Sequence, residues 1–302
     1  MSKVRYTEIT AQKTLQTRAQ TRIYLLLTPA LLVIFILFGG GLTIGFLQAL
    51  GYQPTTGLQA LTSQHFTSIL TDPDFRRSLG LTFYIALTST IIAATISICL
   101  ALSINRWAAN YKIIHFILQI PLAAPHFVIG IAMILLIAPS GLISRLGSHF
   151  FGSDIRTNFP ILINDPGSIG IILVYIWKEI PFITFMLLSV LKNMGNELTE
   201  VGATLKAGPI QRFRFITLPI IRPSLNASCC IVFAYTFGAF EIPYLLGQTY
   251  PLTLPVWAYK NYSDIDLLAR PEGIGIGLII AAIVIFSALL AERLLATPWQ
   301  NR

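Results

Sequence analysis

Hydrophobic residues along this chain gather in six long runs, and the stretches between them are rich in Gly, Pro, Ser and Asp. The runs lie at 23–47, 79–104, 113–138, 168–191, 224–247 and 273–295. Each run is long enough for a helix that crosses a bilayer, which takes about 20 apolar residues. Prolines inside the runs are compatible with this prediction, because neighbouring helices can satisfy the backbone groups that a proline frees. We therefore expect an all-α, polytopic membrane protein with six transmembrane helices.

Composition agrees with this class and excludes others. Hydrophobic residues make up 54% of the chain and charged residues 11%, whereas soluble domains carry about 25% charged residues. The formal charge is +8, but the basic residues alternate with apolar runs and form no continuous surface for nucleic acid. Cys99, Cys229 and Cys230 all lie inside apolar runs, without the spacing of a disulfide framework or a metal site. We expect packing cysteines, no metal and no cofactor.

The distribution of Lys and Arg predicts the orientation. They gather before residue 23, near 106–112, within 192–222 and after 293, whereas Asp and Glu offset them in the other connections. Because cytoplasmic connections carry an excess of Lys and Arg, both termini and the 192–222 connection are expected in the cytoplasm. The first run is too long for a cleaved signal peptide, whose apolar part takes roughly 7–15 residues, although the basic leader also fits a transit peptide. The expected divisions are a basic tail at 1–22, a transmembrane domain at 23–295 and a tail at 296–302.

Three connections, at 48–78, 139–167 and 248–272, are expected on the other side of the membrane. They are longer than a turn requires and too short for an independent domain. Two interpretations stay open on the sequence alone: solvated connections, or a surface that faces an external receptor.

The basic connection at 192–222 is typical of two short amphipathic helices joined by an elbow. Asn196 is suited to cap the first helix, with Glu197 and Glu200 in its first turn. Gly208 and Pro209 suit the end of that helix and the start of the next. The expected apolar positions are Leu198, Val201 and Leu205, then Ile210, Phe213 and one of Ile216 or Thr217, beside Arg212 and Arg214. Such a pair could rest on anionic lipid headgroups or dock a protein; the rigid elbow favours docking, because lipid binding does not need one.

At these residues the chain resembles the permease subunits of ABC-type importers with six-helix cores. Their cytoplasmic "EAA" loop reads roughly E-A-A, three residues, G, nine residues, I-x-L-P, and the matching positions here are Glu200, Ala203, Ala207, Gly208, Ile216, Leu218 and Pro219. Two departures are evident: Val201 and Gly202 replace the two alanines, and Lys206 stands where the usual glycine falls. The segments 177–182 and 237–247 are also similar to the family, the latter to the branch that handles polyamines, ferric iron and thiamine.

The resemblance implies a permease subunit in the cell inner membrane that works with three kinds of partner. These are a pair of ATP-binding subunits, a second permease subunit (this chain again or a similar one) and an extracytoplasmic solute-binding protein, with membrane lipid around them. It also implies that the loop transmits motion from the ATPases, through Glu200, Gly202, Ala203, Ala207, Gly208, Pro209, Leu218 and Pro219. The chain has no Gly-Lys dipeptide and hence no Walker A loop. We therefore expect no catalytic residue here and ATP hydrolysis in a separate subunit.

Candidate residues for the solute pathway are Glu241, Tyr244, Trp177 and Lys178. A carboxylate inside a span indicates function by default, and Glu241 lies between Gly238 and Pro243, where a helix interruption is expected. Glu241 is alternatively a structural carboxylate, capped by a neighbouring helix or paired with Lys178. Lys178 and Glu179 project about 100° apart on a helix and are expected to be structural or to lie near the outer end of the pathway. His126, like His115, is expected to be an interfacial or packing histidine.

The solute is expected to be a polyamine or another small cation, because Glu241 and the acidic outer connections attract positive charge; ferric iron fits the same features. A stand-alone, ion-coupled secondary transporter is the alternative function, but it would call for inverted repeats and several intramembrane carboxylates. A membrane-embedded enzyme would call for a cluster of reactive side chains at membrane depth. Neither alternative needs the EAA-type loop, which therefore favours the importer permease.

Overall fold

The computed structural model describes residues 24–54, 57, 60–108, 112–151, 159–195 and 197–295. Within these ranges the chain is helical and contains no β-strand. Six helices are long and apolar enough to cross a membrane: Tyr24–Ala49, Pro73–Trp107, His126–Phe150, Ile169–Met194, Pro209–Gly238 and Leu267–Arg293. The predicted fold class, an all-α protein with six candidate spans, is confirmed. The predicted tails at 1–22 and 296–302 and the predicted cap Asn196 lie outside the described residues.

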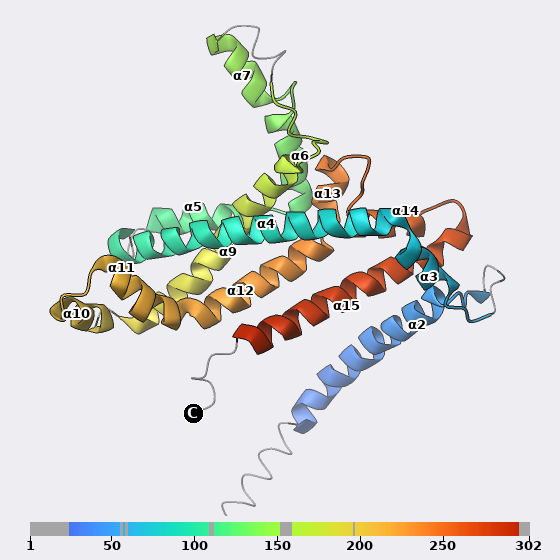
Figure 1. Ribbon diagram of the computed structural model, residues 1–302, viewed down its shortest axis with the longest axis horizontal. Coiled ribbons are helices and arrows are strands. Elements are labelled where there is room, and N and C mark those ends of the chain that lie inside the picture. Colours follow the sequence, from blue (N-terminus) through green and yellow to red (C-terminus); the bar gives the residue numbers. More distant parts are fainter. Residues whose placement is uncertain are drawn as a thin grey trace, which may run out of the picture.

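Short helices and breaks separate the long ones (Figure 1). In chain order the elements are η1 (Phe35–Gly39), α2 (Gly40–Ala49), α3 (Gln64–Thr71), α4 (Pro73–Ser103), η3 (Ile104–Ala108), α5 (Lys112–Ala123), α6 (His126–Ile137), α7 (Leu142–Phe151), α9 (Ile169–Met194), α10 (Glu197–Thr204), α11 (Pro209–Arg212), η4 (Phe213–Thr217), α12 (Leu218–Gly238), α13 (Glu241–Leu246), α14 (Leu254–Tyr262), η5 (Leu267–Ala269) and α15 (Arg270–Leu295). The pair α10–α11 and the pair α3–α14 lie at opposite ends of α4 (Figure 1).

Helices α4, α9 and α12 form the centre of the molecule, and their apolar faces pack on one another. One buried cluster lies toward the α10 end and contains Ile183, Leu187, Leu191 and Ile221. A second lies at the other end, where Tyr175 packs with α6 and α13. The hydroxyl of Ser97 in α4 donates to the backbone carbonyl of Ile180 in α9 over 2.9 Å. This arrangement fixes the two faces of α9 and α12 that meet at the site described below.

The first span, Tyr24–Ala49, lies outside this centre and runs beside α15 (Figure 1). None of its most apolar stretch is buried within the chain. Near its end, Gly45 faces Ile274 of α15: a Cβ added at Gly45 would lie 3.8 Å from the Cγ2 of Ile274. The span is therefore an accessory to the packed body and contributes little to its core.

The third apolar run was expected as one helix over 113–138, and the structure corrects this. Helix α5 ends at Ala123 and α6 begins at His126. Pro125 has no N–H group and disfavours helical backbone at the residue before it, which is Ala124. The candidate span in this region is His126–Phe150, which comprises α6, a turn and α7, so its bounds differ from the expected 113–138.

The fifth run was expected over 224–247, and its bounds also differ. The long helix starts at Pro209 and ends at Gly238. The backbone then leaves the helical conformation at Ala239, and α13 begins at Glu241. The interruption predicted between Gly238 and Pro243 is thereby confirmed, and it places Glu241 in the first turn of a separate short helix.

The outer connections contain helices of their own. Helix α3 precedes α4, α7 extends α6 away from the body, and α14 packs along α15 (Figure 1). The α14–α15 contact is close because Gly273 has no side chain: an added Cβ would lie 2.7 Å from the carbonyl oxygen of Ala258. Helices α3 and α14 form a structured surface at the end of the molecule opposite α10 and α11 (Figure 1).

Candidate functional site

The connection after α9 forms two short helices at one end of the molecule (Figure 1). After α10 the chain reverses through Lys206, whose φ of 56° is in the left-handed region. Gly208 precedes α11, and its N–H donates to Oε1 of Gln211 over 2.9 Å. Pro209 opens α11 with a φ already suited to a helix. The chain direction at this turn is thus held by local hydrogen bonding and by proline.

Gly202 sets how closely α10 approaches the following turn. A Cβ at this position would lie 2.8 Å from Cδ1 of Ile216 and 3.1 Å from Cγ of Arg212. The carbonyl of Gly202 also accepts a hydrogen bond of 3.0 Å from the N–H of Ala207. Glycine replaces an alanine of the family motif here because η4 occupies the space that the methyl group would need.

Four apolar side chains of this segment point away from the body. Leu205 is 77% exposed, Ile210 81% and Phe215 71%, and Val201 is exposed as well. The predicted second stripe is partly wrong, because Phe213 is half-buried and lines a cavity against α4 and α9, while Phe215 faces outward. The π-helical turn η4 accounts for the change, since its wider repeat shifts side chains relative to α-helical spacing. We call Val201, Leu205, Ile210 and Phe215 the apolar knobs.

The remaining predicted loop residues lie along the same segment. Glu200 is exposed on α10, Ala203 lies in the same helix, and Pro209 is exposed at the start of α11. Leu218 and Pro219 open α12 directly after η4, without a break in the helix. The loop therefore continues into a membrane-spanning helix through unbroken helical backbone.

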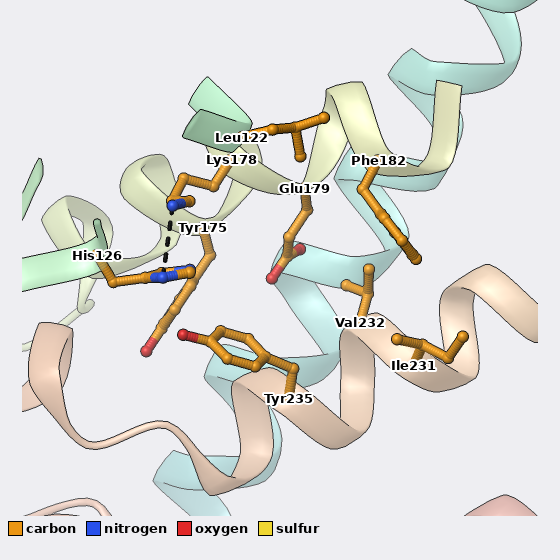
Figure 2. A pocket seen from close by; sticks show the side chains of 9 residues that line it. All are labelled: Leu122, His126, Tyr175, Lys178, Glu179, Phe182, Ile231, Val232 and Tyr235. Carbon is orange, nitrogen blue, oxygen red and sulfur yellow. Dashed lines mark hydrogen bonds between the residues drawn. The ribbon is translucent and has the colours of Figure 1, made fainter. Parts of the chain in front are cut away.

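A cavity lined by apolar side chains and a few ionisable ones lies between α9, α12 and the break that separates α5 from α6. Its volume is about 220 Å³. The lining residues, drawn in Figure 2, are Leu122, His126, Tyr175, Lys178, Glu179, Phe182, Ile231, Val232 and Tyr235. All of them come from apolar runs of the sequence. In the part of the chain that the structure describes, this cavity is therefore the main place where ionisable side chains gather within the candidate spans.

Glu179 is the acidic side of this cavity. It is only 6% exposed, and the hydroxyl of Thr236 in α12 donates to its Oε1 over 2.5 Å. Its Oε2 is buried and has no hydrogen-bond partner among the described residues. The hydroxyl of Tyr175, which is fully buried, also has no partner there. Buried polar groups in proteins are nearly always hydrogen-bonded, so two groups here have unused bonding capacity.

Lys178 is the basic side, and it is 7% exposed. Its Nζ donates to the carbonyl oxygen of Ala124 over 2.6 Å and lies 3.4 Å from Nδ1 of His126 (Figure 2). The helix break before His126 leaves the Ala124 carbonyl without a continuing helix, and the ammonium satisfies it. Because an ammonium only donates, Nδ1 of His126 is the acceptor in this contact. The ring of His126 also packs 4.8 Å from that of Tyr235.

The structure separates the residues that were grouped as a solute pathway. Lys178 lines the cavity, whereas Trp177 is exposed and does not. Glu241 and Tyr244 lie on α13 and are exposed outside the cavity lining. No ion pair within 4.0 Å joins Glu241 to Lys178 in the part of the chain that the structure describes. The alternative in which these two residues pair is therefore absent from this structure.

The sequence interpretation missed three residues that line the cavity with Lys178. Glu179 was expected to be structural or to lie near the outer end of the pathway, and His126 to be an interfacial or packing histidine; Tyr175 was not singled out. The signal for Glu179 was available, because it is an ionisable residue inside an apolar run just as Glu241 is. Tyr175 and His126 gave no such signal, since their roles depend on which helices meet.

Comparison with known proteins identifies the family. Residues 91–296 match the family described as "Binding-protein-dependent transport system inner membrane component". The chain is 22% identical over 219 residues to the molybdenum transport system permease protein ModB of Azotobacter vinelandii, covering 72% of this chain and 93% of that protein. It is 28% identical over 212 residues to the ferric transport system permease protein FbpB of Actinobacillus pleuropneumoniae. That match covers 69% of this chain and only 29% of FbpB.

The fold has a solved counterpart. A chain of a bacterial ABC transporter involved in the import of the acidic polysaccharide alginate superposes with a TM-score of 0.75 at 20% identity. The match covers 93% of this chain and 97% of that one. The family match spans well over half of the sequence. The chain therefore belongs to the binding-protein-dependent transport system inner membrane components, as a multi-pass permease subunit of an ABC importer.

Proposed function

We propose that the apolar knobs dock into a groove of the ATP-binding subunit and carry its motion into the membrane. The observation that supports this most directly is the exposure of Leu205, Ile210 and Phe215 on a segment that is rigidly packed beneath them. Exposed apolar groups on a fixed scaffold are typical of a protein-binding surface. The predicted coupling residues from Glu200 to Pro219 surround these knobs.

The path of the motion follows the helical backbone. The segment η4 continues into α12 through Leu218. At its far end α12 carries Val232, Tyr235 and Thr236, which line the cavity or hold Glu179. A displacement of the loop would therefore move one wall of the cavity relative to α9, as alternating access requires.

The membrane orientation follows from the same proposal. The α10–α11 end lies in the cytoplasm, together with the basic tail at 1–22 and the tail at 296–302, and the transmembrane domain extends over 23–295. The opposite end, with α3 and α14, faces the extracytoplasmic solute-binding protein. Its structured helices favour a receptor-facing surface over plain solvated connections.

A second permease subunit, either this chain or a similar one, completes the pathway. The cavity wall on α12 includes Ile231 and Tyr235, which are exposed within the single chain. A facing subunit would cover this edge and enclose the cavity. Lipid would otherwise meet a polar cavity at this depth, which is unfavourable.

The solute is proposed to pass Glu241 and Tyr244 before it reaches the cavity. Glu241 would attract a positively charged group of the solute, and Tyr244 adds an aromatic group that packs with Phe240 at 4.8 Å and Tyr259 at 5.7 Å. The relatives described above are named for molybdenum and ferric transport, so they lend a polyamine in particular no support.

The test is co-purification of the tagged, detergent-solubilised chain with its ATP-binding subunit. Replacing Ile210 by Asp should abolish retention of the ATPase, because a charge would replace the most exposed knob. The matched control is Ile265→Asp, on a side chain that is 99% exposed at the opposite end, and it should retain the ATPase. Retention of the ATPase by both variants would refute docking through the knobs. Solute movement by the purified chain alone under an ion gradient would refute ATP coupling altogether.

A further inference from the structure

The cavity holds an acidic and a basic side chain that do not pair with each other. Lys178 and Glu179 are neighbours on α9 and leave the helix in different directions (Figure 2). Neither forms an ion pair within 4.0 Å in the described part of the chain. A buried charge without a partner is costly, by several kcal/mol in real proteins. The two groups are therefore kept apart and both face the same small space.

Each of these groups has bonding capacity that the protein leaves unused. Lys178 has three donors, of which two are directed at Ala124 and His126. Oε2 of Glu179 is buried and has no hydrogen-bond partner among the described residues. The same is true of the hydroxyl of Tyr175. A donor, an acceptor and a hydroxyl that can serve as either are thus arranged around the cavity.

The rest of the lining is apolar, and the space is small. Leu122, Phe182, Ile231 and Val232 form most of the walls. An apolar cavity of about 150 Å³ accommodates benzene, so the 220 Å³ found here suits a solute of roughly six to ten non-hydrogen atoms. Apolar walls with a few fixed polar groups are the usual composition of a small-molecule site.

We propose that this cavity binds a small zwitterionic solute, with its ammonium group at Glu179 and its anionic group at Lys178 and Tyr175. The inference deepens the proposed function, since it rests on α9 and α12 lining the solute pathway. A short aliphatic spacer between the two charged groups would lie against Phe182 and Val232. The bound solute would give Lys178 an anionic partner and Glu179 a cationic one.

Solutes of a single charge sign fit this lining less well. A diamine would satisfy Glu179 and bring a second ammonium to Lys178, whereas a divalent anion would satisfy Lys178 and face Glu179. In either case like charges would meet in a site of low dielectric. Glu241 is exposed and lies outside the cavity lining, so it would attract the ammonium end of a solute from outside the cavity.

The test is a ligand panel on the full chain in lipid nanodiscs, read by ligand-observed saturation-transfer NMR. The probes are unbranched ω-amino acids of about three to seven carbons, chosen for the size of the cavity, with the matching α,ω-diamines and α,ω-dicarboxylates. We expect at least one ω-amino acid to bind about tenfold or more tightly than both of its analogues, the range of a hydrogen bond to a charged group. Equal or tighter binding of a diamine or a dicarboxylate, or no binding of any probe, would overturn the proposal.

Two variants should change which class of ligand is preferred, an effect that misfolding would not produce. Glu179→Gln removes the ammonium partner and should shift the preference to the dicarboxylate, whereas Lys178→Met should shift it to the diamine. The exposed controls Glu292→Gln and Lys260→Met lie outside the cavity and should keep the parent preference. An unchanged preference in both cavity variants would contradict the assignment. If a variant does not fold, the ligand panel on the parent chain decides whether the proposal stands.

The experiment separates this inference from the proposed docking function. Ligand binding to the nanodisc sample needs neither ATP nor another subunit. A chain that retains its ATPase but shows no preference for a zwitterion would remove only the zwitterion assignment. A chain that binds the zwitterion and does not retain the ATPase would instead remove only the docking proposal.

Discussion

Thr236 on α12 donates its hydroxyl to Glu179 on α9 over 2.5 Å, and this bond joins the two helices that form the cavity. Thr236 is buried, and it sits two residues before α12 ends at Gly238. The helix that continues from the α10–α11 segment thus holds the buried carboxyl group directly. The side chain of Thr236 therefore links the position of the α10–α11 segment to the orientation of the Glu179 carboxyl group.

Thr236→Val should weaken this link. It removes a donor to a buried carboxyl group and should lower the free energy of unfolding by about 1–3 kcal/mol, with transport reduced further because Glu179 loses its orientation. Thermal unfolding in detergent and solute uptake in proteoliposomes check the two effects. Thr236→Ser should restore both. Thr95→Val is the matched control, because the exposed Thr95 hydroxyl bonds only to its own helix, at Ile91; an equal loss there would contradict the prediction.

Gly202→Val should separate α10 from η4. Two extra methyl groups would enter a space where a single Cβ already lies 2.8 Å from Ile216, and such overpacking costs about 1–3 kcal/mol. We expect most of the ATPase to be lost in co-purification.

A second change distinguishes this clash from a general defect. Ile216→Ala in the same chain would free the space and should recover ATPase retention. Gly277→Val serves as the control, because nothing lies within 4 Å of a Cβ at Gly277. If the double variant does not regain ATPase retention, the close approach of α10 to η4 is not the reason why Gly202 is needed.

Gly273→Val should destabilise the outer end strongly. The added Cβ would meet backbone atoms of α14, at 2.7 Å from both the Ala258 oxygen and the Tyr262 nitrogen, and backbone cannot yield as a side chain can. We expect a loss of about 3 kcal/mol or more, at the upper end of overpacking effects, measured by thermal unfolding in detergent. ATPase retention should persist wherever the variant still folds, since the loop lies at the other end of α4.

The proposed orientation predicts which positions an impermeant reagent reaches in intact cells. In a chain whose three native cysteines are replaced by serine, Ile265→Cys should react with a membrane-impermeant maleimide. Leu205→Cys should react only after the cells are opened, although its side chain is also highly exposed in the structure. The opposite pattern would invert the assignment of the cytoplasmic side.

The number of spans and the fold class could be predicted from the sequence because hydrophobic length is a local property. The bounds of the third and fifth spans could not. At Pro125 the restriction on the preceding residue stops a helix inside a continuous apolar run, and at Pro209 a polar amphipathic segment turns out to be part of the long helix that becomes α12.

The cavity was predictable only in part. Lys178 was singled out because a lysine inside a span is unusual. Its partners were not, since the Ala124 carbonyl becomes available only through the helix break, and Thr236 reaches Glu179 only because α9 and α12 pack face to face. Such contacts depend on tertiary arrangement, and one sequence contains no direct record of it.

The position of the first span has a consequence for how the protein is made. Tyr24–Ala49 enters the bilayer before the other five spans have been synthesised, and it buries none of its apolar stretch in them afterwards. Within the chain, its side chains therefore gain little from packing against the other spans. Its neighbour α15 is the last of the six to emerge. Gly45 can meet Ile274 only then, so the contact between these two helices is among the last steps of assembly within the chain.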